Sequence, residues 1–181
     1  MLLAARHPES WRRLRQALSG AGCQKTYLAE VLGVPFAPRE TPFVSRGPGP
    51  QSWVVDAPIG RTGRRGSRVH VGGGRQPLSA RTEFLALEER AQTTLVQARL
   101  ARGRAHQVRA HLAHLGHPVV GDDVYGPETA TTHALRLHAL SVELAHPVSG
   151  QPLRIEAPPP AWAKRASHVH DADAPGESSV T

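Results

Sequence analysis

The sequence predicts an α+β fold in which short helices flank a mixed, mainly antiparallel sheet. Two pairs of strand-like segments are each joined by a short polar connection, which favours antiparallel hairpins. Two other segments carry apolar residues at the helical period. The 181 residues are enough for one domain with its own core. We expect this domain over residues 1–163 and a disordered tail over residues 164–181, where small and polar side chains dominate.

The N-terminal part of the chain predicts a helix followed by a strand. Apolar residues at helical spacing indicate the helix over residues 8–18. Residues 25–32 alternate as a strand does, with Tyr27, Ala29 and Val31 on one face. The opposite face is not cleanly polar, so we expect both faces to be partly covered.

Two stretches rich in proline and glycine, residues 33–50 and 61–77, predict loops on either side of a short strand within residues 51–59. The second stretch has no periodicity and is basic. It either drapes over phosphates or forms a mobile solvated loop, and the sequence leaves both interpretations open. Its arginines are Arg61, Arg64, Arg65, Arg68 and Arg75.

The rest of the chain predicts two hairpins with a helix between them. The first hairpin joins residues 81–88 to 93–100. The helix covers residues 107–115, with an apolar stripe toward the core. The second hairpin joins residues 135–144 to 151–157, and the prolines that follow end the sheet.

The charge of the chain indicates a polyanionic partner. The formal net charge is +7, and arginine carries nearly all of it because Lys25 and Lys164 are the only lysines. Nucleic acid is the usual partner of such an excess, although genome composition also raises arginine usage. The single cysteine, Cys23, excludes an internal disulfide and favours a reducing compartment. With no apolar run long enough to cross a membrane, we expect a cytoplasmic protein.

The segment before and within the second helix carries polar groups that a core does not require. Arg104 and His106 lie at the predicted helix start, where free backbone N–H groups favour an anion. Arg109 follows His106 by about one turn, so both side chains can share a face. The alternative is a surface helix with solvated charges.

The histidines and aspartates beyond this point have simpler interpretations. His111, His114 and His117 suggest a metal site, because His111 and His114 are three residues apart on a helix and can share an ion, with Asp122 as the third ligand, but no cysteine lies nearby. We expect partly exposed histidines and no metal. Asp122 or Asp123 is expected to cap a turn. Tyr27 on its own fits an ordinary core tyrosine.

Taken together and in order, these motifs resemble the catalytic domain of the RluA-type pseudouridine synthases. The resemblance runs from Met1 to about Trp162. The segments that carry it are Lys25-Thr-Tyr27, Ala80-Arg-Thr82, Gly103-Arg-Ala-His-Gln-Val-Arg109, His111-Leu112, Leu115-Gly-His-Pro118, Gly121-Asp-Asp-Val-Tyr-Gly126, Leu137-His-Ala139 and His146-Pro-Val-Ser-Gly150.

The resemblance implies an enzyme that isomerises uridine in ribosomal or transfer RNA to pseudouridine without a cofactor or metal. In the family an aspartate attacks the sugar, and the uracil detaches, turns and rejoins through carbon 5. By this resemblance Arg109 pairs with the aspartate, and Tyr27 stacks on the base and acts in proton transfer. The expected RNA-binding residues are Lys25, Arg104, His106 and Gln107.

One departure from the family concerns the nucleophile. The family aspartate lies in a His-Arg-Leu-Asp segment just before a run that matches Met1–Glu9, so the 181 residues do not contain it. Neither Asp56 nor Asp122 occupies its place. We therefore expect a partial catalytic domain, truncated at the N-terminus and inactive alone. We also expect an exposed strand edge near residues 25–32, and a monomer if the sheet is complete.

Two other hypotheses remain open at this point. The chain is then either a non-catalytic RNA-binding remnant of the family or an α+β scaffold whose helix binds another protein. RNA binding that weakens with salt favours the first of these. A stable protein partner without RNA binding favours the second.

Overall fold

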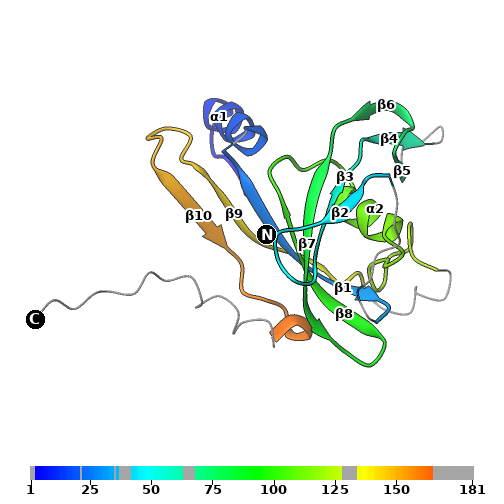
Figure 1. The fold of residues 1–181 in the computed structure, drawn as a ribbon. Coiled ribbons are helices and arrows are strands. Elements are labelled where there is room, and N and C mark those ends of the chain that lie inside the picture. The colour runs from blue at the N-terminus through cyan, green and yellow to red at the C-terminus, as the bar shows by residue number, and fades with distance from the viewer. Residues whose placement is uncertain are drawn as a thin grey trace, which may run out of the picture.

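The computed structural model has a large sheet, a small sheet and two α-helices (Figure 1). It describes residues 3–20, 22–34, 36, 42–62, 68–127 and 134–164. The helices are α1 (Pro8–Ser19) and α2 (Gln107–His114). The strands are β1 (Gln24–Leu32), β2 (Val44–Arg46), β3 (Ser52–Asp56), β4 (Ile59–Thr62), β5 (Arg68–Val71), β6 (Arg75–Leu78), β7 (Arg81–Glu89), β8 (Thr93–Leu100), β9 (Leu137–Ala145) and β10 (Pro152–Glu156).

The large sheet has seven strands in the order β10-β9-β1-β8-β7-β3-β2. This arrangement confirms the α+β class and both predicted hairpins, β7 with β8 and β9 with β10. Every strand pair among the described residues is antiparallel, so the expected mixed component is not present there. The two predicted helices and the short strand β3 also form where the sequence placed them.

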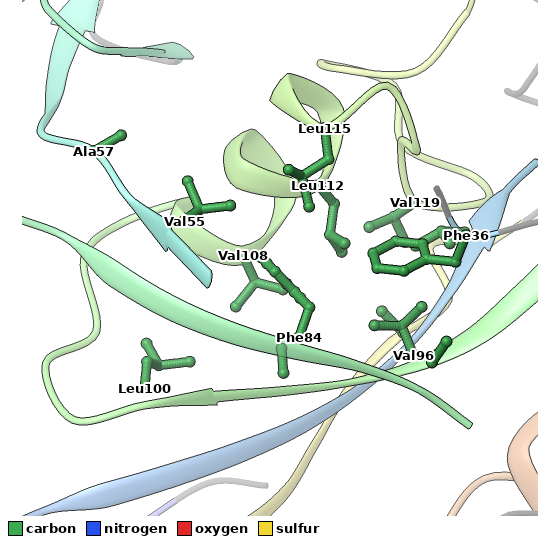
Figure 2. Packing of buried hydrophobic residues seen from close by; sticks show 14 residues of the cluster. Phe36, Val55, Ala57, Phe84, Val96, Leu100, Val108, Leu112, Leu115 and Val119 are labelled. Carbon is green, nitrogen blue, oxygen red and sulfur yellow. The ribbon is translucent and has the colours of Figure 1, made fainter. Parts of the chain in front are cut away.

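The main core lies between α2 and one face of the large sheet (Figure 2). Leu112 and Val108 of α2 pack against Phe84 of β7 and Val96 of β8, and Leu112 is fully buried. Period-2 alternation along the strands directs these apolar side chains toward the helix. The packing therefore fixes α2, and the polar residues around it, over the centre of the sheet.

Two smaller apolar clusters lie elsewhere on the sheet, and one of them covers the second face of β1, as the sequence of residues 25–32 predicted. Leu28 of β1 packs with Leu95, Ala163 and Trp162, on the side of β1 opposite Ala29. A further cluster joins α1 to Cys23, Val142 and Leu144 through Leu14 and Leu18. Both faces of β1 are thus covered.

The expectation that residues 25–32 form an exposed strand edge is wrong. β1 pairs with β8 on one side and with β9 on the other, so it lies inside the sheet. Strand β9 comes from more than a hundred residues later in the chain, and local sequence does not reveal such a partner. The edges of the large sheet are β10 and β2.

The prediction that residues 33–50 and 61–77 form loops is also partly wrong. Residues 33–50 contain β2, which pairs with β3, and residues 61–77 contribute to a small antiparallel sheet in the order β5-β4-β6. The glycines here permit a close approach of two strands. A Cβ atom on Gly60 would lie 2.5 Å from the carbonyl oxygen of Gly73, so β4 and β6 pack as tightly as they do only with glycine at position 60.

Some expectations fall outside the described residues. The tail predicted over residues 164–181 is one of them, apart from Lys164. Within the described ranges, no helix has the length and hydrophobicity that a membrane-spanning segment requires.

Candidate active site and RNA interface

Arg109 is the centre of the candidate site, and an acidic turn holds it in place. Helix α2 directs Arg109 toward the turn that follows Val120. Its Nε donates to Oδ2 of Asp122 at 2.9 Å, and its Nη2 donates to Oδ1 of the same carboxylate at 2.6 Å. Nη2 also contacts Asp123 at 3.1 Å. Such a two-point pair fixes both the position and the plane of the guanidinium group.

Asp122 is fully buried and has other partners besides Arg109. Its Oδ1 accepts hydrogen bonds from the backbone N–H groups of Val124 at 3.0 Å and Tyr125 at 2.9 Å, which confirms the predicted capping role. Burial acts to raise the pKa of Asp122, but the hydrogen bonds from Arg109 and from the two amides outweigh burial and lower it. Asp122 is therefore a charged anchor for Arg109.

One edge of the Arg109 guanidinium is left for another partner. Nε and Nη2 are occupied by Asp122 and Asp123, whereas Nη1 has no hydrogen bond within the described part of the chain. The side chain as a whole is 13% exposed. Hydrogen bonding to Asp122 raises the pKa of Arg109, and the group stays cationic. Arg109 is thus a fixed, charged group with one donor that is unused among the described residues.

Gln107 holds the loop before α2 in place through its side-chain amide. The backbone N–H of Arg104 donates to Oε1 of Gln107 at 2.9 Å. The Nε2 of Gln107 donates to the carbonyl of Arg81 and to Oγ1 of Thr82, both at 3.0 Å. Gln107 is buried and its amide is fully used inside the protein. In this conformation it positions the loop that carries Arg104 and does not face solvent.

Tyr125 connects the candidate site to the small sheet, and sequence reasoning missed it. Its hydroxyl accepts a hydrogen bond from the backbone N–H of Val69 at 2.9 Å and shares another with Nδ1 of His106 at 3.2 Å. The guanidinium groups of Arg109 and Arg68 each lie 5.4 Å from the centre of its ring. The motif Gly121–Gly126 contained the signal, but its spacing indicated only a turn.

Tyr27 lies on the face of β1 that α2 covers. It is half-buried and packs against the main core cluster, which includes Val108, the neighbour of Arg109. Burial raises the pKa of Tyr27, and the nearby Cys23 raises it further, so the phenol is neutral at physiological pH. Tyr27 and Arg109 are therefore on the same side of the sheet.

A basic groove lies between α1 and the loop before α2. Its cavity volume is about 520 Å³. Lys25 and Arg104 line it, and the sequence predicted both as RNA-binding residues. The sequence did not single out three further lining residues, Trp11, Arg15 and Arg102. We refer to this set, with Leu3, Leu14 and Leu18, as the α1 groove.

The composition of the α1 groove suits a nucleotide. The guanidinium of Arg15 lies 5.2 Å from the ring centre of Trp11, which is 51% exposed. The Nζ of Lys25 donates a hydrogen bond to the carbonyl oxygen of Leu18, near the end of α1. Cations next to an exposed aromatic ring are the usual surroundings of an RNA phosphate and an unstacked base.

His111 of α2 and His117, which follows this helix, are structural in this conformation. His111 is fully buried and bonds Oγ1 of Thr82 through Nδ1 at 2.9 Å, and His117 is buried against the carbonyl of Leu32. The expectation that these two would be partly exposed is wrong. Burial lowers the pKa of His111 to about 4, so its ring is neutral at pH 7. Within the described ranges, no three potential ligands gather in a way that suits a metal ion.

The fold and this site define an α+β domain with a basic surface and a fixed cation, as in enzymes that act on RNA. Residues 1–114 match the family model for RNA pseudouridylate synthase. The chain belongs to this family, whose members are isomerases that modify RNA. The resemblance seen in the sequence is thereby confirmed.

Individual relatives agree with the family match. An uncharacterised RNA pseudouridine synthase of Chloroflexus aurantiacus is 37% identical over 163 residues, covering 89% of this chain and 46% of that protein. Ribosomal large subunit pseudouridine synthase D of Nitrosomonas europaea is 37% identical, covering 88% of this chain and 44% of that protein. The chain thus spans about half the length of the curated relatives it matches.

Solved structures support the fold. Human RNA pseudouridylate synthase domain containing 1 superposes with a TM-score of 0.64 at 23% identity, covering 86% of this chain and 61% of that one. Human RNA pseudouridylate synthase domain containing 4 gives a TM-score of 0.55 at 23% identity, covering 88% of this chain and 64% of that one.

Proposed function

We propose that the protein is an RNA pseudouridine synthase, which isomerises uridine in ribosomal or transfer RNA to pseudouridine, and that the 181 residues alone do not complete the reaction. The observation that carries the proposal is the state of Arg109. Asp122 and Asp123 bind Nε and Nη2 of its guanidinium, which leaves Nη1, without a partner among the described residues, to pair with a further carboxylate. An arginine held in this way keeps a nearby aspartate ionised, which the attack on the ribose requires.

In this proposal each residue has a separate part in the reaction. An aspartate oxygen bonds to the ribose carbon as the bond from that carbon to the uracil nitrogen breaks. The detached uracil turns, and its carbon 5 bonds to the ribose as the aspartate is released. Tyr27 supplies a stacking face for the flipped base and takes part in removing the proton from carbon 5. Lys25, Arg104 and His106 bind the RNA around the uridine.

Neither Asp122 nor Asp56 suits the role of nucleophile. Asp122 is fully buried, and its oxygens are occupied by Arg109 and two amides. Asp56 is exposed and lies 3.5 Å from the Arg81 guanidinium. The 181 residues contain no His-Arg-Leu-Asp segment. We therefore propose that this chain alone binds RNA but forms no pseudouridine.

A direct test uses the purified chain and a uridine-containing RNA hairpin. We expect RNA binding that weakens steeply with salt, because counterions return to the phosphates that the cations release. We expect no pseudouridine by mass spectrometry of the digested RNA. Product formation would show that another acid of this chain acts as the nucleophile.

The α1 groove favours a second candidate function, a non-catalytic RNA-binding protein of the same family. Four cations and an exposed tryptophan support RNA binding without any need for chemistry. The discriminating observation is the nucleotide sequence upstream of the first codon. An in-frame His-Arg-Leu-Asp segment favours the enzyme, and a stop codon before any such segment favours the RNA-binding protein.

We further propose that the protein acts as a monomer in the cytoplasm. The single, buried cysteine is compatible with a reducing compartment. Light scattering coupled to gel filtration checks the monomer, and a dimer mass would contradict it.

A further inference from the structure

The small sheet carries charge of one sign. Its strands and their connections, residues 59–78, contain five arginines and no aspartate or glutamate. Arg61, Arg68 and Arg75 are exposed on β4, β5 and β6. The sheet lies beside α2, which contacts β5 (Figure 1). A structured basic surface therefore adjoins the helix that carries Arg109.

The register of the small sheet places two of these arginines opposite each other. Arg61 of the central strand β4 is the partner of Arg75 on β6, next to an irregularity of the register between Ile59 and Arg61. Directly paired residues of an antiparallel ladder project to the same side, where like charges destabilise the sheet. Neither arginine has an ion pair with a carboxylate of the described chain, unlike Arg109 and Arg154. An anion bound between the two guanidinium groups would relieve this repulsion.

The small sheet is also held firmly in place. The close approach of Gly60 to the backbone of Gly73 and Gly74 ties β4 to β6. The Tyr125 hydroxyl accepts the hydrogen bond from Val69 and so ties β5 to the turn that anchors Arg109. An anion bound by this sheet is therefore fixed relative to the candidate site.

We propose that Arg61 and Arg75 bind a backbone phosphate of the RNA strand that flanks the target uridine. The inference rests on the proposed function, because that function makes RNA the substrate. Guanidinium groups from two paired strand positions can bind the oxygens of one phosphate, to which they are complementary in charge. Such a contact sets the position of the RNA without reading its sequence. The small sheet and the α1 groove then bind different parts of the same RNA.

The test compares RNA binding by the full 181-residue chain and by Arg61→Gln/Arg75→Gln. Fluorescence anisotropy with a labelled RNA hairpin gives Kd over a series of salt concentrations. We expect the double variant to bind about 10-fold more weakly at 0.1 M salt, and the slope of log K against log salt to decrease by about 1. Without RNA, its Tm should stay equal or rise, because a repulsion is removed.

A matched control removes the same charge elsewhere. Arg13→Gln/Arg154→Gln alters two exposed arginines that carboxylates already neutralise, and we expect its Kd and salt slope to equal those of the unaltered chain. Arg61→Lys/Arg75→Lys should keep the salt slope, because both charges remain. It should also bind more weakly than the unaltered chain, because lysine lacks the guanidinium fork.

Each contrary result identifies which idea fails. Equal Kd and slope for the Gln variant would overturn the phosphate site and leave the proposed function intact. A lower Tm for that variant would also overturn it, because the arginines would then stabilise the sheet. Equal competition by polyglutamate of matched charge would assign the sheet to an acidic protein partner instead. If the unaltered chain bound no RNA, the proposed function would fail as well.

Discussion

At the scale of single residues, Arg109 and Asp122 form the pair on which the site depends. The sequence identified Arg109 through its spacing from His106 and through the family resemblance. It placed Asp122 in a turn but did not join the two, because 13 residues and a change of direction separate them. Only the packing of α2 on the sheet brings that turn to the arginine.

Replacing Asp122 tests how firmly it anchors Arg109. Asp122→Asn keeps the shape but removes the charge, and we expect it to lower the free energy of unfolding by about 1–3 kcal/mol. Asp123→Asn is the control, because that side chain is 76% exposed and its contact is weak in water. Urea unfolding measures both variants. Equal stabilities for the two would contradict the anchoring role.

The buried imidazole of His111 gives stability a defined pH dependence. Burial lowers its pKa from 6.5 to about 4, so the unfolded chain binds this proton more readily than the folded one. The contribution of neutral His111 to the free energy of unfolding is complete above pH 6.5. As the pH falls toward 4, this contribution is lost and the free energy of unfolding decreases by about 3 kcal/mol. Urea unfolding of the unaltered chain and of His111→Gln between pH 7 and pH 4 checks this. The variant should show the smaller loss, and an equal loss would exclude His111 as the cause.

At the scale of the elements, the small sheet depends on a glycine that brings two strands together. Gly60→Ala places a Cβ atom 2.5 Å from the carbonyl oxygen of Gly73, and we expect a loss of about 1–3 kcal/mol. Gly73→Ala is the matched control, because the nearest atom to its Cβ is the His70 ring at 3.6 Å. Thermal unfolding compares them. A Gly60 variant as stable as the control would contradict the close packing of β4 and β6.

The same elements show how far sequence reasoning reaches. Helices α1 and α2 and both hairpins follow from local periodicity and turn residues, which a single segment contains. The small sheet does not follow from the local sequence, because its glycines and arginines give no apolar alternation. A glycine that permits close backbone contact also cannot be told apart from its neighbours in a glycine-rich segment. The central place of β1 was missed for a different reason, since its partner β9 is distant in sequence.

At the scale of the whole molecule, two basic surfaces adjoin α2 and the loop before it, which carry the candidate site. The α1 groove lies on the side of α1 and β1, and the small sheet lies beside α2 (Figure 1). The net charge of +7 predicted an RNA partner but not this division, because composition carries no position. The arrangement suits an RNA that contacts both surfaces while a uridine is held near Tyr27 and Arg109.

The central claim is that Arg109 is the partner of a nucleophilic aspartate in RNA pseudouridine formation. The most direct test joins the part of the Chloroflexus relative that precedes its matched region to this chain. Mass spectrometry then measures pseudouridine in a uridine-containing RNA hairpin. We expect pseudouridine to form with the joined protein and not with the joined protein that carries Arg109→Gln. Equal product with and without Arg109, in a joined protein that folds and binds RNA, would contradict it.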